Sequence, residues 1–347
     1  MLKKRIKIIL VLIYVLMLAA PGCGSDTQQA ATPADFYRGK TINLVVSHSA
    51  GSYTDLVSRV LASYLERDTG ANVIVTNRLG AGGLEGINYV YRSETDGLTL
   101  GVITQGKLVP NKIMSEPAAI YDIEDFSYIM NIGACLYSFI VSPNGPYQSV
   151  ADLQAGSELI IGGASLSGPI TLGGMTVVEL LGLDAKVVTG LNSIADQALA
   201  ANRGETVGWV GTIRSALSYL DSGMSEPMFV LASERDPLVP HVPAITELID
   251  IQDDDMALVH LWETGLASTV VFLAPPGVPE DRLAFLRGLA AEWAQDEEFR
   301  EEIDSVTGFD VPTYVTGETV AETMSDLAVT LDDFRDKFAE MIAKYRA

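Results

Sequence analysis

The chain has 347 residues, 48% of them hydrophobic, and its 45 acidic and 23 basic residues give a net charge of −22. This length allows two or three domains, and the hydrophobic share excludes an intrinsically disordered chain. The acidic excess repels nucleic-acid phosphates and anionic lipid headgroups, so we expect neither as a partner. Two cysteines exclude a disulfide scaffold and a cysteine metal cluster.

The N-terminus has the pattern of an export signal. Basic residues at positions 3–7 precede an apolar stretch, Ile8 to Ala20, which is too short to span a bilayer. Cys23 follows at the place where a bacterial lipoprotein is cleaved and lipidated. We therefore expect a signal peptide at residues 1–22, lipidation of Cys23 and a flexible tether at 23–35. Ordinary signal cleavage, with Cys23 merely left over, is the alternative.

The mature sequence then alternates short apolar strands with amphipathic helices. The first helix starts near residues 54–55, with Thr54 or Asp55 as its predicted N-cap, and Asp55 is expected to act as a cap more than as a ligand contact. A glycine-rich loop at 80–83 leads into the next helix. This pattern predicts strands at 41–46, 72–76 and 98–103, and a helix at 84–92.

A second series of the same kind follows, and the chain ends in helices. We expect strands at 138–142, 159–162, 187–188, 206–210, 228–232 and 270–273. Helices are predicted from 150 and at 170–181, 193–201, 279–294, 297–304 and 317–345.

Two successive α/β series predict a two-lobed α/β fold, in which each lobe is a mostly parallel sheet flanked by helices. The chain is expected to cross between the lobes near 132–141 and 265–273. The first lobe would then comprise residues 36–137 and 265–347, and the second lobe residues 138–264. A cleft between lobes, at the carboxyl ends of parallel strands, is the default ligand site.

Three loops that join a strand to a helix are rich in glycine, serine or both, at residues 49–55, 80–83 and 164–168. Exposed backbone N–H groups and the helix dipole at such places favour an anion. Three loops of this kind from two lobes would form a clamp for a small carboxylate. Each loop taken alone is also compatible with an ordinary turn, because glycine and serine are common in turns.

Five motifs occur in order along the mature chain. The glycine-rich stretch VIVTNRLGAGGLEG occupies residues 73–86, and the others are INLVVSHSAGSYTD at 42–55, DGLTL at 96–100, VLASERDPLVPHVPAITE at 230–247 and LAPPGVP at 273–279. Taken together, these motifs resemble those of the substrate-binding proteins of the tripartite tricarboxylate transporters, the TctC or Bug family, and the stretch at 73–86 is similar to the family signature V-x-N-R-P-G-A-G-G-x-x-G.

The resemblance implies a two-lobed periplasmic binding protein that closes on a small organic carboxylate and delivers it to a membrane permease. It also implies that no catalytic residue, metal or cofactor is needed. Together with the export pattern, we expect a monomer anchored at Cys23 in an extracytoplasmic compartment. The implied ligand contacts are Ser49, Ala50, Gly51, Thr54, Asp55, Ala81 and Gly82 in the first lobe, and Ser165, Ser167, Gly168 and Thr171 in the second.

Other functions stay open at this stage. A sensor that passes its ligand-bound form to a signalling receptor would have the same sequence features. An exported α/β hydrolase or a dinucleotide-dependent oxidoreductase is less favoured, because both motifs are incomplete. Gly163 to Ser167 lacks the final glycine of G-x-S-x-G, and Gly80 to Glu85 lacks the last glycine of G-x-G-x-x-G.

Overall fold

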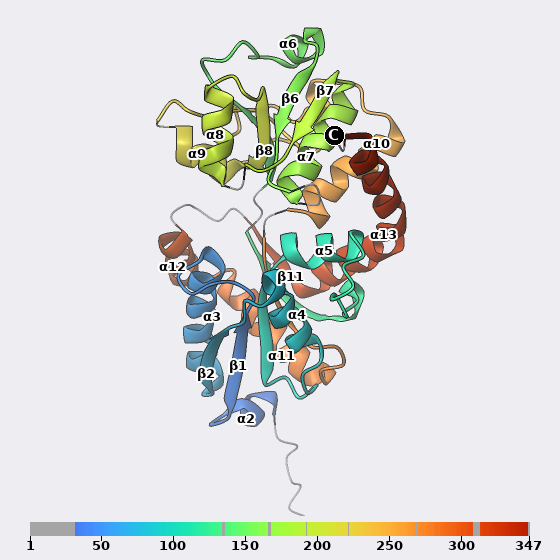
Figure 1. Ribbon diagram of the computed structural model, residues 1–347. Coiled ribbons are helices and arrows are strands. Elements are labelled where there is room, and N and C mark those ends of the chain that lie inside the picture. Colours follow the sequence, from blue (N-terminus) through green and yellow to red (C-terminus); the bar gives the residue numbers. More distant parts are fainter. Residues whose placement is uncertain are drawn as a thin grey trace, which may run out of the picture.

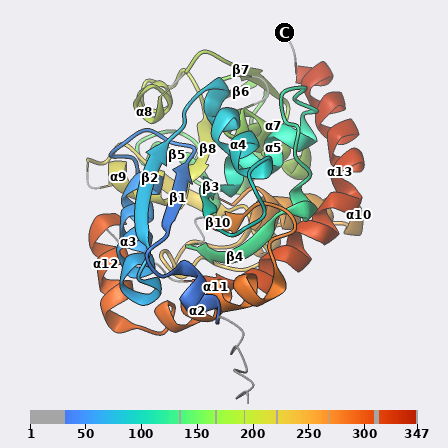
Figure 2. The same cartoon turned by 90° about the horizontal axis from the view of Figure 1, so that it is seen from below.

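The computed structural model describes residues 32–133, 136–165, 168–191, 193–220, 222–267, 269–307 and 313–345. The chain forms two lobes, each built around one β-sheet with helices on its faces (Figures 1 and 2). Within these ranges, no helix combines the length and apolar character that a membrane crossing needs. The predicted signal peptide and Cys23 lie outside the described residues.

The first lobe contains a six-stranded sheet in the order β11-β4-β10-β3-β1-β2. Its strands are β1 (Thr41–Val46), β2 (Asn72–Asn77), β3 (Thr99–Thr104), β4 (Ser127–Ile132), β10 (Val270–Ala274) and β11 (Tyr314–Thr316). Its helices are α2 (Pro33–Tyr37), α3 (Tyr53–Thr69), η1 (Ala81–Gly83), α4 (Leu84–Tyr91), α5 (Gln105–Ile113), η2 (Ile123–Asp125), α11 (Glu280–Trp293), α12 (Glu297–Thr307) and α13 (Gly317–Tyr345).

The second lobe contains a five-stranded sheet in the order β7-β6-β8-β5-β9. Its strands are β5 (Tyr137–Val141), β6 (Leu159–Gly162), β7 (Ala185–Val188), β8 (Gly208–Thr212) and β9 (Glu226–Val230). Its helical segments are α6 (Val150–Ala155), α7 (Pro169–Leu181), α8 (Ile194–Asn202), α9 (Ile213–Leu220), η3 (Ile245–Glu247), α10 (Asp253–His260) and η4 (Leu261–Gly265).

The two lobes repeat one topology. In the first lobe, β1 pairs in parallel with both β2 and β3, and the antiparallel strand β10 borders β3. In the second lobe, β6 pairs in parallel with both β7 and β8, and the antiparallel strand β5 borders β8. The segment β1-α3-β2-α4-β3-α5 therefore corresponds, element by element, to β6-α7-β7-α8-β8-α9.

This topology turns the carboxyl ends of the parallel strands in each lobe toward the other lobe. Thr104, the last residue of β3, pairs with Val270, which begins β10 where the chain returns to the first lobe. Thr212, the last residue of β8, pairs with Tyr137, which begins β5 where the chain enters the second lobe. The loops that follow β1, β2, β3, β6 and β8 thus lie at the facing ends of the two lobes (Figure 1).

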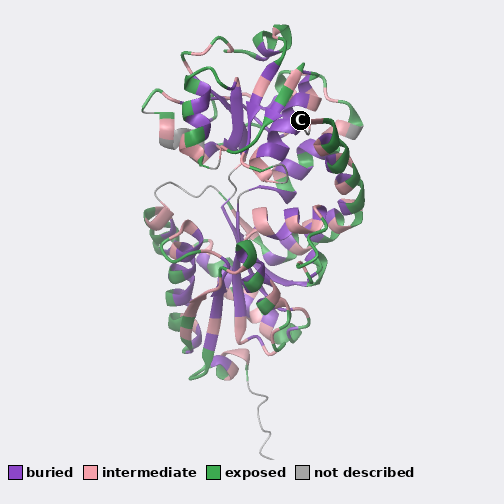
Figure 3. Ribbon diagram, viewed as in Figure 1, coloured by how far each residue is buried: buried purple, intermediate pink, exposed green. Residues whose placement is uncertain are grey.

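The predicted two-lobed α/β architecture is confirmed, although both sheets are mixed rather than mostly parallel. The difference comes from β5, β10 and β11, each of which pairs antiparallel with its neighbours. The central strands are buried along nearly their whole length in the interiors of the two lobes, whereas the edge strands β2, β7 and β11 are largely half-buried or exposed (Figure 3). Leu44, Val45 and Val46 of β1 have no exposed surface, so this strand holds the following loop on a rigid base.

The C-terminal helix α13 spans both lobes (Figure 1). In the first lobe, Nε of Arg335 donates to the carbonyl of Ile113, at the end of α5, over 3.3 Å. In the second lobe, Nζ of Lys344 and the hydroxyl of Tyr345 each donate to Oε1 of Glu179 on α7 over 2.7 Å. The last helix therefore connects the two lobes independently of the two chain crossings.

Candidate functional site

The loop between β1 and α3, residues 47–52, lies at the centre of the first lobe's facing end. Ser52 is the N-cap of α3, because its hydroxyl accepts a hydrogen bond from the Asp55 N–H over 3.3 Å. The sequence-based choice of Thr54 or Asp55 as the cap is therefore wrong. Both residues lie within the helix and are buried, while Ser49, Ala50 and Gly51 are exposed.

Asp55 ties this loop to its surroundings instead of capping the helix. Its carboxylate accepts hydrogen bonds from the Gly51 N–H over 2.8 Å, from Nδ2 of Asn77 over 2.9 Å and from Nε of Arg59 over 3.0 Å. Burial raises the pKa of Asp55, but the hydrogen bonds from Arg59, Gly51 and Asn77 outweigh burial, and the pKa is lowered. Asn77 also donates to the His48 carbonyl over 2.9 Å. The Asp55 carboxylate is therefore ionised and already paired within the protein.

The glycine-rich turn after β2 packs against the same loop. Ala81, Gly82 and Gly83 all have positive φ, at 51°, 69° and 104°, a conformation that strongly favours glycine. A Cβ atom on Gly83 would lie 2.8 Å from the carbonyl oxygen of Ser47. Only glycine at this position lets the turn approach the end of β1 so closely. Ala81 and Gly82 themselves remain exposed at the facing end of the lobe.

Lys107, in the first turn of α5, is a site residue that the sequence analysis missed. Its Nζ donates to the Ser47 carbonyl over 3.1 Å, so the ammonium lies where β1, the glycine-rich turn and α5 meet. Burial lowers the pKa of Lys107. The signal available in the sequence was a lysine four residues after a predicted strand, and no helix was predicted there.

His48 lies beside Lys107 and is expected to make stability depend on pH. Burial, and secondarily the charge of Lys107, lower the pKa of His48 to about 4. The unfolded chain, with a histidine pKa of about 6.5, therefore binds a proton that the folded protein does not bind between these two values. The free energy of unfolding should fall as the pH drops from about 6.5 to about 4.

NMR titration of the His48 ring, combined with urea unfolding at each pH, checks this prediction. The His48→Asn variant should lose that part of the pH dependence, because asparagine does not titrate. A His48 ring that titrates near its ordinary pKa in the folded protein would contradict it.

In the second lobe, the loop that begins at Gly163 is held by the end of β7. The Gly163 N–H donates to the Val188 carbonyl over 2.8 Å, and the Gly190 N–H donates to the Ala164 carbonyl over 3.0 Å. Ser165 is exposed and its carbonyl accepts from the Gly168 N–H over 3.0 Å. Ser167 lies outside the described residues.

Thr171 is placed behind this loop and not on its surface. It is fully buried, its side chain packs against Gly163, and its Oγ1 has no hydrogen-bond partner among the described residues. Its position fits a residue that supports the loop from within. The other predicted second-lobe contacts, Ser165 and Gly168, lie on the end of the lobe that faces the first lobe.

The two lobes meet at a contact between Tyr53 and Arg214. Tyr53 is the first residue of α3 and Arg214 is the second residue of α9. The guanidinium carbon of Arg214 lies 4.6 Å from the centre of the Tyr53 ring, which is a cation–π contact. Arg214 is the second site residue that the sequence analysis missed, because only the folded chain brings it to the loop at 47–52.

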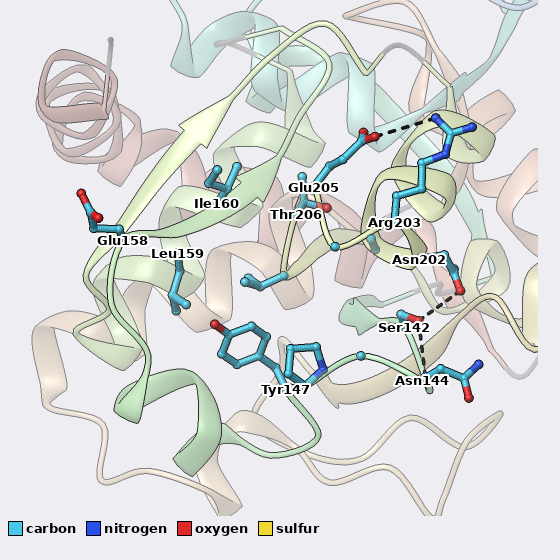
Figure 4. A pocket seen from close by; sticks show the side chains of 15 residues that line it. Ser142, Asn144, Tyr147, Glu158, Leu159, Ile160, Asn202, Arg203, Glu205 and Thr206 are labelled. Carbon is cyan, nitrogen blue, oxygen red and sulfur yellow. Dashed lines mark hydrogen bonds and ion pairs between the residues drawn. The ribbon is translucent and has the colours of Figure 1, made fainter.

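A separate cavity of about 440 Å³ lies at the opposite end of the second lobe (Figure 4). Its lining includes Ser142 after β5, Leu159 at the start of β6 and Thr206 before β8, so it opens away from the first lobe. None of the predicted ligand contacts lines it. We therefore place the candidate site at the facing ends of the lobes and not in this cavity.

Comparison with known proteins identifies the family and the fold. The model of the family described as tripartite tricarboxylate transporter family receptor, TctC, matches residues 57–314. The chain belongs to this family. Its curated relatives include the protein BugT of Bordetella pertussis, which is 26% identical over 250 residues, covering 67% of this chain and 73% of that protein.

Solved structures show the same fold. A TctC solute-binding protein from Polaromonas aligns with a TM-score of 0.72 and 20% identity, over 87% of this chain and 99% of that chain. The Rhodopseudomonas palustris protein Rpa4515, solved with adipate, aligns with a TM-score of 0.62 and 20% identity, over 88% of this chain and 97% of that chain. The chain is thus a TctC-family solute-binding protein, as its sequence motifs predicted.

Proposed function

We propose that this TctC-family protein captures a small organic carboxylate between its two lobes and delivers it to the permease of a tripartite tricarboxylate transporter. One observation carries the proposal beyond family membership. The Lys107 ammonium lies at the junction of the first-lobe loops, and no carboxylate of the described residues is within 4.0 Å of it. A half-buried cation beside exposed backbone N–H groups favours an anionic ligand. The adipate held by Rpa4515, which has the same fold, supports a carboxylate.

The ligand contacts proposed in the first lobe surround the loop at 47–52. Ser49 and Ala50 are exposed residues whose N–H groups we propose as ligand donors, whereas the Gly51 N–H is already bonded to Asp55. Asp55 and Thr171 are buried, so we assign them to holding the loops in place. The proposed ligand contacts are therefore Ser49, Ala50, Gly51, Ala81 and Gly82 in the first lobe and Ser165, Ser167 and Gly168 in the second, and the buried Thr54 also belongs to the supporting residues.

We also propose that the protein is exported, lipidated at Cys23 and held outside the cytoplasmic membrane as a monomer. The basic and apolar N-terminal segments and the position of Cys23 support this location. We assign it no catalytic step, metal or cofactor. Mass spectrometry of the mature chain tests the anchor: an N-terminal Cys23 carrying a diacylglycerol group supports lipidation, and an unmodified cysteine overturns it.

Thermal unfolding of the soluble domain against a panel of mono-, di- and tricarboxylates tests the proposed ligand class. A carboxylate at 100 times its dissociation constant should stabilise the protein by about 2.7 kcal/mol. An uncharged amide of the same acid serves as the control, and it should give no shift because it lacks the charge. If no carboxylate raises the melting temperature, whereas NAD or an ester does, binding of organic acids is overturned in favour of an enzyme.

A further inference from the structure

The side chain of Gln105 lies at the hinge, the place where the chain crosses between the lobes after β4 and before β10. Gln105 is the first residue of α5 and is only 2% exposed. The first crossing leaves β4 after Ile132, the second returns to β10 at Val270, and these two residues are paired in the sheet. A buried amide is therefore located where the lobes can rotate against each other.

Three hydrogen bonds hold Gln105 to the first lobe. Its backbone N–H donates to the Thr269 carbonyl over 3.1 Å, and its Oε1 accepts from Oγ1 of Thr269 over 2.9 Å. Oε1 also accepts from Nδ2 of Asn131 over 3.2 Å. Asn131 belongs to β4 and Thr269 directly precedes β10, so both residues move with the first-lobe sheet. The Gln105 amide is thus held in place by its own lobe.

A fourth hydrogen bond from the same side chain reaches the second lobe. Nε2 of Gln105 donates to the carbonyl of Thr264 in η4. A carbonyl can only accept, and Oε1 already accepts from two donors, so the amide has one orientation that satisfies all its partners. Thr264 lies near the end of η4, where helix carbonyls lack a partner within the helix. The Gln105 amide supplies that partner from the other lobe.

The two residues that precede Thr264 are fastened to the second lobe. Nε1 of Trp262 donates to Oγ1 of Thr176 on α7 over 3.0 Å, and both of these residues are fully buried. The Glu263 carboxylate accepts from the hydroxyl of Ser233, which follows β9, over 2.7 Å. The Thr264 carbonyl therefore moves with the second lobe, and its bond to the first-lobe amide links the lobes directly.

The described arrangement of the lobes is open at the candidate site. Ser49 and Ala50 of the first lobe and Ser165 of the second lobe are exposed at the facing ends, so the lobes are not closed over them. A cavity of about 150 Å³ adjoins the hinge and is lined by residues of both crossings, Gly133 and Ala267 among them. This cavity gives the amide and the carbonyl room to separate without displacing packed side chains.

We propose that the hydrogen bond from Gln105 to Thr264 is a hinge clasp, which holds the lobes in the open arrangement and breaks when they close on a ligand. This inference rests on the proposed function, because it takes closure on a bound solute as given. Gln105 is then a positioning residue that changes the measured affinity without touching the ligand. Stabilising the open arrangement reduces the fraction of closed molecules, and the measured affinity falls with that fraction.

Small-angle X-ray scattering of the ligand-free protein tests the clasp without any ligand. Gln105→Met keeps the length of the side chain and removes its amide, so the radius of gyration should fall as closed molecules become more populated. The matched control is Thr269→Val, which removes one first-lobe bond to Oε1 and keeps the bond to Thr264. Its radius of gyration should equal that of the wild-type protein. No decrease in Gln105→Met, or an equal decrease in both variants, overturns the clasp.

NMR of the wild-type side-chain amides is a second test, which stands even if Gln105→Met fails to fold. The probe is adipate, the acid held by Rpa4515. Saturation with adipate should remove the protection of the Gln105 Nε2 protons from hydrogen exchange. The Nδ2 protons of Asn131 bond within the first lobe and should keep their protection. Unchanged protection of Gln105 in the adipate-bound protein overturns the inference.

Calorimetric titration separates this inference from the proposed function. The dissociation constant of adipate should be about 3- to 10-fold lower in Gln105→Met than in the wild-type protein, and unchanged in Thr269→Val. Another acid of the thermal-unfolding panel replaces adipate if only that acid binds. Equal dissociation constants in Gln105→Met and the wild-type protein overturn the clasp and leave the carboxylate function standing. Failure of the wild-type protein to bind any acid overturns the proposed function, and the scattering result then decides the clasp alone.

Discussion

Replacing Gly83 by alanine should destabilise the protein by about 3 kcal/mol and abolish ligand binding. The substitution forces alanine to a φ of 104° and brings its Cβ to 2.8 Å from the Ser47 carbonyl oxygen. The left-handed conformation costs about 1 kcal/mol, and the clash with the backbone adds about 2 kcal/mol by shifting one of the two loops. Urea unfolding measures the loss of stability. Calorimetric titration with a carboxylate that the wild-type protein binds measures the loss of ligand binding.

Gly82→Ala is the matched control for Gly83→Ala. Gly82 has a φ of 69°, but a Cβ there meets nothing within 4 Å. Gly82→Ala should lower the free energy of unfolding only by the cost of the left-handed conformation, about 1 kcal/mol. The neighbouring Ala81 already adopts a φ of 51°, so this turn accepts alanine in that conformation. Equal losses of stability in the two variants would show that close packing against Ser47 is not what requires glycine at position 83.

Replacing Asp55 by alanine should lower the free energy of unfolding by about 3 kcal/mol. It should also weaken ligand binding strongly, although the carboxylate is only 1% exposed and acts through the loop it holds. The substitution leaves the Gly51 N–H and the Asn77 amide without their acceptor, so the loop at 47–52 loses its internal ties. Asp55→Asn should cost less, because an amide oxygen can still accept one of these hydrogen bonds. Chemical unfolding and calorimetric titration of each variant provide the measurements.

The Arg59→Gln variant separates two interactions of the Asp55 carboxylate: its ion pair with Arg59 and its hydrogen bonds that hold the loop at 47–52. The Arg59 side chain is 55% exposed, so its ion pair with Asp55 should contribute less than about 1 kcal/mol. If Arg59→Gln were as damaging as Asp55→Ala, the ion pair, and not the hydrogen bonds to the loop, would be the important interaction of Asp55.

The alternation of strands and helices was readable from the sequence wherever periodicity was strong. The strand at 159–162 and the helix at 317–345 have the predicted bounds, because each has a continuous pattern and clear ends. The family motifs also placed the loops of the candidate site correctly relative to their strands. In these segments local preference and tertiary packing favour the same structure.

Helix α5 was not predicted, and Lys107 was missed with it. Gly106 and Pro110 both lie within this helix, and each is normally read as a helix breaker. Leu108, Val109 and Ile113 are fully or almost fully buried, so their packing overrides the weak local preference. Because no helix or strand was predicted for this segment, the sequence analysis could not place Lys107 at the candidate site.

Arg214 and the role of Asp55 depend on contacts between residues distant in the chain. The Arg214–Tyr53 contact joins two lobes, and no local pattern encodes it. The Asp55–Asn77 hydrogen bond joins a helix to the end of a neighbouring strand. Ser52, Thr54 and Asp55 are all good N-cap residues, so the sequence could not choose among them without the backbone geometry.

The helix α13 has an energetic consequence for ligand capture. Its 29 residues extend about 43 Å and fasten to α5 in one lobe and to Glu179 in the other. A rotation of one lobe against the other must bend α13 or break its hydrogen bonds to Glu179. The free energy of that deformation lowers the measured affinity for a solute relative to the intrinsic affinity of the closed site. Shortening α13 should therefore change the measured affinity without changing any ligand contact.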